Sequence, residues 1–143
     1  MKIFKRILIG LLIIIGGLII IYFSGPKIET PIFTRNLPEI PADVLTIENW
    51  VNEKEAKQKD IKPNNQAQVI WYNEKFNQTD YSIVYLHGFG ASQQEGYPVH
   101  RNLADSLKAN LFLARQRGHG LSTKEAFKGN TANSYMLSAM EAL

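Results

Sequence analysis

Just beyond its midpoint the chain reads Tyr81-Ser82-Ile83-Val84-Tyr85-Leu86-His87-Gly88-Phe89-Gly90-Ala91-Ser92. The apolar run 83–86 contains β-branched and aromatic side chains, a composition typical of a buried strand. The run ends at residues 87–90, where two glycines permit backbone angles and close approaches that a Cβ would forbid. A strand that feeds such a turn directs backbone N–H groups into open space, which is one way to build an oxyanion hole.

A second glycine-rich motif, Arg117-Gly118-His119-Gly120-Leu121-Ser122, follows another apolar run at residues 111–114. Between the two runs, the spacing of Val99, Leu103 and Leu107 predicts an amphipathic helix within residues 98–109, and Asn110 is a plausible left-handed residue to end it. A strand, a helix and a strand in this order predict a right-handed parallel crossover, and hence an α/β fold.

Together, the two motifs resemble those of the α/β-hydrolase family. In many of its lipases, esterases and peptidases the oxyanion loop follows the third sheet strand and reads His-Gly-x-x-x-Ser, which residues 87–92 match. The resemblance covers residues 67–143, the N-terminal half of such a domain. Within the family, this segment is similar to serine aminopeptidases and lysophospholipases. The resemblance implies a partial α/β-hydrolase sheet with its first strands and helices.

The resemblance also assigns expected roles to individual residues. The backbone N–H of Phe89 would donate to the oxyanion, in a loop shaped by His87, Gly88 and Gly90. The second motif, Arg117, Gly118, His119 and Gly120, would be structural, with hydrogen bonding inside the loops as the expected role of both histidines. Arg115 stands where the family often has an acidic residue, so the salt bridge typical of that position is not expected. Glu95 and His100 flank the loop and could line a pocket, with exposure to solvent as the default expectation for each.

The other parts of a serine hydrolase site are missing from the pattern. None of the seven serines has glycine both two residues before and two residues after it, as Gly-x-Ser-x-Gly requires. No glycine follows Gly129, and none of the three histidines follows a credible nucleophile and acid. We therefore expect the nucleophile, the acid and the base to lie outside this chain, which would be a fragment that ends before its active centre and is inactive alone.

The N-terminus carries a second organising feature. Residues 7–23 contain no charge and consist almost entirely of Ile, Leu and Gly, a length close to the roughly 30 Å of bilayer hydrocarbon. The run is too long for a signal-peptide core and ends in a poor cleavage site, so we expect an uncleaved single-pass anchor in the cytoplasmic membrane. Residues 1–6 form a basic flank that contains Lys2, Lys5 and Arg6, which predicts a cytoplasmic N-terminus and an extracytoplasmic remainder. Two basic residues on the other side of the helix, Lys27 and Arg35, weaken this topology prediction slightly.

Charge and composition narrow the function classes. The three basic residues of the flank account for the net charge of +3, so the rest of the chain is formally neutral and gives no footprint for nucleic acid. The chain has no cysteine, which excludes a disulfide scaffold and thiol catalysis. His87 and His119 have no third ligand at suitable spacing, so we expect no metal, and no cofactor is indicated.

The remaining segments are predicted from local patterns. Residues 24–42 hold four prolines and predict a semi-rigid linker. Residues 43–60 predict an amphipathic helix with Asp43 as N-cap, apolar side chains including Val44, Ile47, Trp50 and Val51 on one face, and the charges of 53–60 on a solvated face. Residues 67–72 predict a strand with Val69 and Trp71 on one side, which would pair with 83–86 in an edge hairpin. Residues 134–143 predict a last helix.

Two functions follow from these expectations. The first is a membrane-anchored α/β-hydrolase that cleaves a carboxylic ester, a lipid or a peptide with a serine nucleophile, the substrate being one for the complete protein. The alternative is a non-catalytic membrane-anchored module that binds a partner or lipid through the helix of residues 43–59 and an exposed sheet edge.

Overall fold

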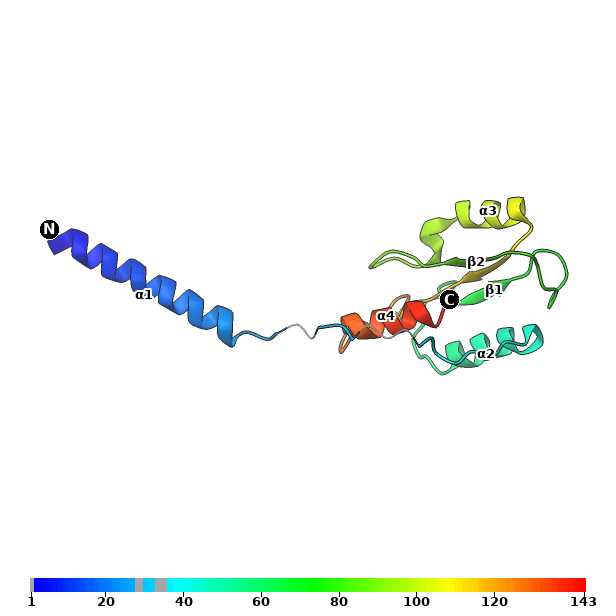
Figure 1. Ribbon diagram of the computed structural model, residues 1–143, viewed down its shortest axis with the longest axis horizontal. Helices are drawn as coiled ribbons and strands as arrows, with labels where there is room; N and C mark the ends of the chain where they lie inside the picture. The colour runs from blue at the N-terminus through cyan, green and yellow to red at the C-terminus, as the bar shows by residue number, and fades with distance from the viewer. Residues whose placement is uncertain (1, 28–29, 33–35) are drawn as a thin grey trace. The chain divides into compact units, whose positions relative to one another are not determined.

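The structure is a computed structural model and describes residues 2–27, 30–32 and 36–143 (Figure 1). The chain divides into two compact units, residues 1–30 and residues 31–143. The predicted linker 24–42 falls in part on residues 28–29 and 33–35, which lie outside the described residues, as does Arg35. The described residues between 25 and 43 form no helix or strand, as the linker prediction requires.

The first unit contains one helix, α1 (Lys2–Ser24). Its 23 residues span roughly 34 Å at 1.5 Å per residue, and none of them is buried. By length and composition, α1 is apolar and long enough to cross a membrane. The predicted apolar segment 7–23 lies within this helix, and the basic residues of the flank form its first turns.

The second unit is a small mixed α/β structure. Its elements in chain order are α2 (Val44–Ala56), β1 (Gln68–Ile70), β2 (Ser82–Tyr85), the 3₁₀ turn η1 (Gln93–Gly96), α3 (Val99–Leu107), β3 (Asn110–Leu113) and α4 (Ala132–Met140). α3 covers one face of the sheet, and α2 covers the other (Figure 1). The predicted class, α/β with one N-terminal apolar helix, is confirmed at this level.

The strands form one sheet in the order β1-β3-β2. β2 and β3 are parallel neighbours joined through α3, so the predicted parallel crossover is confirmed. The predicted hairpin between the first two strands is wrong, because β3 lies between them and pairs antiparallel with β1. The sequence Leu111-Phe112-Leu113 is apolar on both faces, which suits β3 to the central position, and the connection from 71 to 81 is long enough to pass over it.

The register divides the sheet side chains between two environments. Leu111 and Leu113 face α3 and form a closed core with Ala104, against which Ile70, Ile83 and Tyr85 pack. On the opposite face of the sheet, the side chains of three residues that are paired across the strands point toward α2: Val69, Phe112 and Val84. The predicted alternation of Val69 and Ile70 to opposite sides of their strand is therefore confirmed.

Helix ends are set by identifiable caps. The Asp43 side chain accepts a hydrogen bond from the N–H of Leu45 at 3.0 Å, so the predicted N-cap of α2 is confirmed. The left-handed residue that ends α3 is Lys108, with φ 54°, and not Asn110, which begins β3 instead. The Asn110 side chain accepts from the N–H of Tyr72 at 3.0 Å and donates to the carbonyl of Asn77 at 2.8 Å. Asn110 therefore ties the 71–81 connection to the central strand.

Candidate functional site

The two glycine-rich motifs lie at the same edge of the sheet. The loop of residues 86–92 follows β2, and the loop of residues 114–122 follows β3. Because β2 and β3 are adjacent and parallel, their carboxyl ends meet at this edge, where open α/β sheets place their ligand sites. The structure thereby brings together His87 and His119, whose ring centroids are 4.9 Å apart.

The backbone N–H groups of the first loop differ in whether they have an acceptor. The N–H of Gly88 donates to Oε2 of Glu95 at 2.8 Å, and the N–H of Gly90 donates to Nε2 of His119 at 3.1 Å. The N–H of Ala91 donates to the Gly88 carbonyl at 3.2 Å. Within the described parts of the chain, the N–H of Phe89 has no acceptor. It is the one donor from 88 to 91 that is available to a ligand.

His119 is held in its neutral form by its surroundings. Its Nε2 accepts from Gly90, so its proton is on Nδ1, which donates to the carbonyl of Arg117 at 3.1 Å. The side chain is 1% exposed. Burial lowers the pKa of His119 below its usual value and the neighbouring His87 lowers it further, against an opposing effect of the Arg117 carbonyl. A neutral imidazole is the form that can accept the Gly90 hydrogen bond.

His87 joins the two loops. Its Nδ1 donates to the Gly88 carbonyl at 3.0 Å, and its Nε2 accepts from the N–H of Gln116 at 3.3 Å. The Gln116 side chain in turn donates a hydrogen bond from Nε2 to the His87 carbonyl at 2.6 Å. The polar contacts of both histidines are thus hydrogen bonds within and between these loops, the role expected for them.

The second motif shows why glycine stands at its central position. Gly118 has φ +78°, and a Cβ there would lie 2.3 Å from Nδ2 of Asn130. That amide donates to the Arg117 carbonyl at 3.2 Å, while the N–H of Arg117 donates to Oγ of Ser138 in α4 at 3.1 Å. Gly120 also has positive φ, at +68°. The Arg117–Gly120 turn is therefore tied to both the 124–131 loop and α4.

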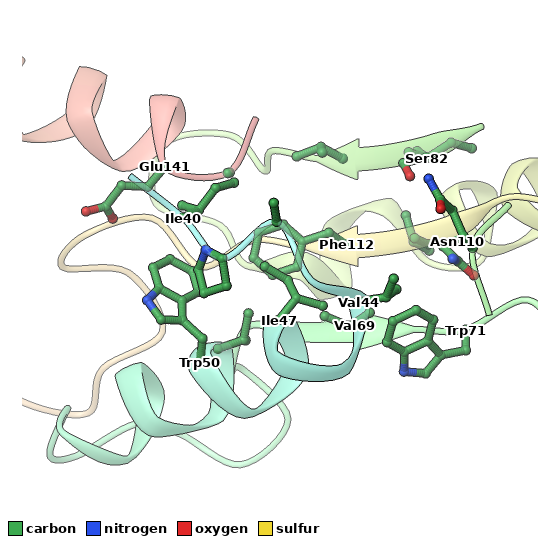
Figure 2. Close-up of a pocket in the computed structure, with 18 residues that line it drawn as sticks. Ile40, Val44, Ile47, Trp50, Val69, Trp71, Ser82, Asn110, Phe112 and Glu141 are labelled. Carbon is green, nitrogen blue, oxygen red and sulfur yellow. The ribbon is translucent and has the colours of Figure 1, made fainter. Parts of the chain in front are cut away.

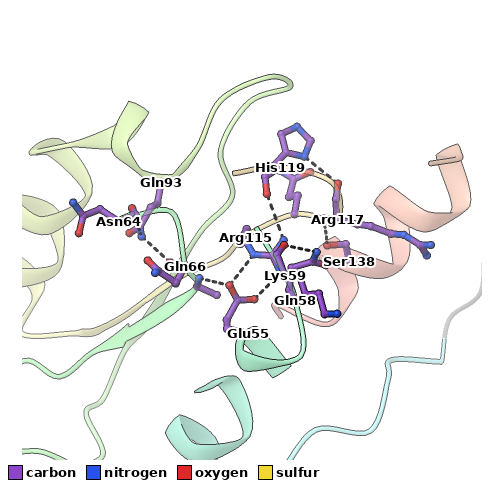
Figure 3. A network of polar contacts seen from close by, with 12 residues as sticks. Glu55, Gln58, Lys59, Asn64, Gln66, Gln93, Arg115, Arg117, His119 and Ser138 are labelled. Atoms are coloured by element: carbon purple, nitrogen blue, oxygen red, sulfur yellow. Dashed lines mark hydrogen bonds and ion pairs between the residues drawn. The ribbon is translucent and has the colours of Figure 1, made fainter. Parts of the chain in front are cut away.

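Sequence analysis missed the ion pair that supports this edge (Figure 3). The sequence pattern predicts Glu55 on the solvated face of its helix, but its side chain is 9% exposed and accepts from Nε and Nη2 of Arg115 at 2.7 and 2.9 Å. The same carboxylate accepts from the N–H of Ala67 at 3.0 Å. Glu55 lies four residues after buried Val51, which was the available signal that it shares the inward face. Arg115 also reaches the carbonyl of His119, at 3.4 Å.

The two flanking residues have different surroundings. Glu95 is exposed, as expected, although its carboxylate is bonded to Gly88. The expectation for His100 is wrong: it is 5% exposed, its Nε2 lies 3.0 Å from the Gln93 carbonyl, and its ring meets Tyr85 edge-on. Gln93 is itself buried and donates to the carbonyls of Asn64 and Gln66, an arrangement that the sequence pattern did not reveal.

Phe89 presents its side chain as well as its N–H at this edge. The side chain is 83% exposed, and its ring centroid lies 5.6 Å from that of Phe127 and 5.7 Å from that of His119. No serine hydroxyl in the described part of the chain is hydrogen-bonded to a histidine. Residues 2–27, 30–32 and 36–143 also contain no group of three or more side chains suited to hold a metal ion.

An apolar groove lies on the opposite face of the sheet, away from the α3 core (Figure 2). It has a volume of about 270 Å³ and runs between α2, the sheet and the end of α4. The side chains that define this α2 groove are Val44, Ile47, Trp50, Val69, Trp71 and Phe112. Both tryptophans of the chain line it.

Comparison of the chain with protein-family models, with curated proteins and with solved structures finds no match.

Proposed function

We propose that the chain is part of a membrane-anchored α/β-hydrolase that cleaves a carboxylic ester, a lipid or a peptide outside the cytoplasmic membrane. In this proposal, residues 67–143 form the N-terminal half of the catalytic domain. The observation that carries the proposal is the unpartnered N–H of Phe89, which follows a parallel strand and precedes the helix of a strand–helix–strand unit. Hydrolases of this family take one oxyanion-hole donor from a loop in that position.

The role of Phe89 would be to bind developing negative charge. When a nucleophile attacks a carbonyl carbon, the carbonyl oxygen becomes an oxyanion, and a fixed N–H donor stabilises it more than it stabilises the neutral substrate. One such donor contributes on the order of 3 kcal/mol to transition-state stabilisation. The bonds of Gly88 and Gly90 on either side hold the loop in place before substrate binds, so little reorganisation is needed.

The attacking hydroxyl, the acid and the base are assigned in this proposal to residues other than these 143. No serine here has the Gly-x-Ser-x-Gly context that raises a nucleophile on a sharp turn. The second oxyanion donor, which in the family is the residue after the nucleophile, would come from the same outside segment.

α1 would anchor the domain. Its length matches the bilayer core, and the cluster of Lys2, Lys5 and Arg6 favours a cytoplasmic N-terminus, which would place residues 31–143 outside the cytoplasm. A cysteine introduced into residues 1–6 and, separately, at the exposed Asn52 would test this topology. Only the Asn52→Cys chain should react with a membrane-impermeant maleimide in intact cells, and the reverse result would contradict it.

The catalytic proposal is tested on the gene in its native cell. We expect the sequence after codon 143 to encode Gly-x-Ser-x-Gly, and the membrane fraction to contain a product that a fluorophosphonate labels. In that product, Phe89→Pro removes the N–H and should lower kcat by about 10²–10³, whereas the matched Phe89→Ala keeps it and should retain most activity. No such motif in any frame, or labelling of the 143-residue chain alone, would contradict the proposal.

A second function is favoured by the α2 groove. A non-catalytic anchored module would use this apolar groove to bind a partner or lipid, since exposed apolar concavities of this kind mark interaction sites. Because Trp50 and Trp71 both line it, a bound apolar molecule should change their fluorescence. A saturable change on adding a fatty acid, lost in Phe112→Asp, would favour the module; an unchanged spectrum would count against it.

A further inference from the structure

We propose that Glu95 is a positioning residue for the Phe89 N–H, acting together with His119. The two side chains take the N–H groups on either side of Phe89, so that its own N–H is the one donor left free and its direction is fixed. This inference rests on the proposed function for its catalytic meaning, but the arrangement itself is tested independently below.

The position of Glu95 is set by the turn that carries it. η1 begins after Ser92, whose Oγ accepts from the N–H of Gln94 at 3.3 Å, and the N–H of Glu95 donates to the Ser92 carbonyl at 3.0 Å. This turn brings the carboxylate back to the N–H of Gly88, 2.8 Å away. The contact joins residues seven apart in sequence, so it closes the loop that holds Phe89.

Close packing on the next residue keeps the turn in place. A Cβ at Gly96 would lie 2.5 Å from the Tyr85 ring and 2.6 Å from the His100 ring, so the turn lies directly against β2 and α3. At Gly88 a Cβ would lie 3.3 Å from both carboxylate oxygens of Glu95. Glycine at both positions therefore allows the carboxylate to reach the N–H without moving the sheet.

The two flanking bonds act on opposite sides of one residue. Glu95 holds Gly88, and His119 holds Gly90, which has φ +77°. With both neighbours fixed, rotation of the two peptide groups around Phe89 is restricted. An oxyanion donor must be held within about 0.5 Å of its working position, and supporting hydrogen bonds of this kind provide that precision.

The acceptor geometry of Glu95, and not its charge, carries this role. The role needs only an acceptor for the Gly88 N–H, so a neutral acceptor of the same shape should hold Phe89 equally well. The negative charge itself would repel the charge that develops on an oxyanion nearby. Glu95→Gln retains an acceptor oxygen, whereas Glu95→Ala removes it. The groups that face Glu95 include the Tyr85 hydroxyl, and burial together with Glu95 raises the pKa of Tyr85 above its usual value.

The test uses the full 143-residue chain in detergent micelles, with backbone amide resonances assigned by NMR. In the natural chain the Gly88 amide, which donates to Glu95 at 2.8 Å, should exchange slowly with solvent. In Glu95→Gln, slow exchange of the Gly88 amide and the position of the Phe89 resonance should both be kept. In Glu95→Ala, exchange at Gly88 should accelerate and the Phe89 resonance should shift. Glu125→Ala, which removes an exposed carboxylate bonded to Lys128, should change neither.

Two results would overturn the proposal: a Gly88 amide that exchanges as fast in the natural chain as in Glu95→Ala, or a Phe89 resonance that is unmoved in Glu95→Ala. Neither depends on catalysis. Failure to find a fluorophosphonate-labelled product would instead defeat the proposed hydrolase function, with the Gly88 measurements unaffected. In a labelled complete enzyme, Glu95→Ala should lower kcat with little change in KM, and Glu95→Gln should restore it.

Discussion

The loops that follow β2 and β3 and the α2 groove are stabilised in opposite ways. The loops are held by hydrogen bonds of His87, His119 and Gln116 and are supported by the buried Glu55–Arg115 ion pair. In the groove, apolar side chains of α2 and the sheet surround about 270 Å³ of unfilled space. One region has its geometry specified bond by bond, and the other has apolar surface without close packing.

This difference bears on where function resides. Hydrogen bonds have direction, so a polar network fixes atoms at positions that chemistry can use. Apolar contacts have no direction, and a groove lined by them accepts varied shapes. The loops are therefore suited to hold a donor such as the Phe89 N–H, and the groove is suited to cover or be covered by apolar surface.

The largest effect should come from breaking the ion pair beneath the loops. Glu55→Ala leaves the Arg115 guanidinium, 9% exposed, without its carboxylate, and also leaves the Ala67 N–H without its acceptor. Loss of one partner of a buried pair costs about 3–5 kcal/mol. The measurement is urea unfolding of the full chain in micelles followed by fluorescence, since Trp50 and Trp71 both lie in residues 31–143.

The exposed pair of Glu125 and Lys128 supplies the control. Its side chains are 68% and 74% exposed, so Glu125→Ala should change the free energy of unfolding by less than about 0.5 kcal/mol. A loss in Glu55→Ala no larger than this would show that the loops do not depend on the buried pair.

The next largest effect should separate the two faces of the sheet. Leu113 is fully buried in the α3 core, and Leu113→Ala should cost about 3 kcal/mol, because it removes apolar contacts and leaves a cavity. Ile47 is half-buried at the α2 groove, where space is already open, so Ile47→Ala should cost only about 1 kcal/mol. Equal losses by the same urea measurement would mean that the groove is as tightly packed as the core.

A smaller effect should distinguish two glycines with the same backbone conformation. Gly118 and Gly129 have φ of +78° and +74°, but only at Gly118 would a Cβ meet other atoms, including the Ala126 carbonyl at 2.7 Å. Left-handed strain alone should cost about 1 kcal/mol in Gly129→Ala, and strain plus overpacking about 2–3 kcal/mol in Gly118→Ala. The measurement is the melting temperature of each variant. Equal decreases in Gly118→Ala and Gly129→Ala would show that the second loop is not closely packed around Gly118.

Local patterns predicted the elements of this fold well and their pairing less well. Asp43 as a cap, the parallel crossover and the side alternation of Val69 and Ile70 all follow from residues close together in sequence. The position of β3 between β1 and β2 depends on competition among three strands for the buried centre of the sheet. Neighbouring residues do not encode that competition, so the hairpin prediction failed.

The candidate site shows the same division. The motifs located both loops, because glycine spacing is a local signal, and Phe89 was named through the family resemblance. The bonds from Gly88 to Glu95 and from Gly90 to His119 span seven and 29 residues, and the Glu55–Arg115 pair spans 60. The spacing from Val51 indicates that Glu55 faces inward, but it gives no sign of a partner so distant in sequence. Contacts of this kind became visible only in the folded chain.

The smallest effect tests the histidine that connects the loops. Because burial lowers the pKa of His119 in the folded chain, the unfolded chain binds more protons at and below its ordinary pKa of about 6.5. The stabilisation that His119 contributes is therefore fully present above pH 6.5 and is lost as the pH falls from there through the lowered folded-state pKa. Protonation also places a hydrogen on Nε2, which can then no longer accept from Gly90.

The unfolding free energy, measured in urea at steps from pH 7.5 to 5, should fall toward acid in the natural chain and fall less in His119→Gln. His100→Gln is the matched control, since His100 is equally enclosed but contacts Gln93 and Tyr85 and not the loops. At pH 5 the Gly90 amide of the natural chain should also lose protection, measured as its exchange rate relative to the intrinsic rate at the same pH. If acid weakened the natural chain and His119→Gln alike, the polar network at the loops would owe nothing to the neutral imidazole, and the contrast with the α2 groove would rest on the buried ion pair alone.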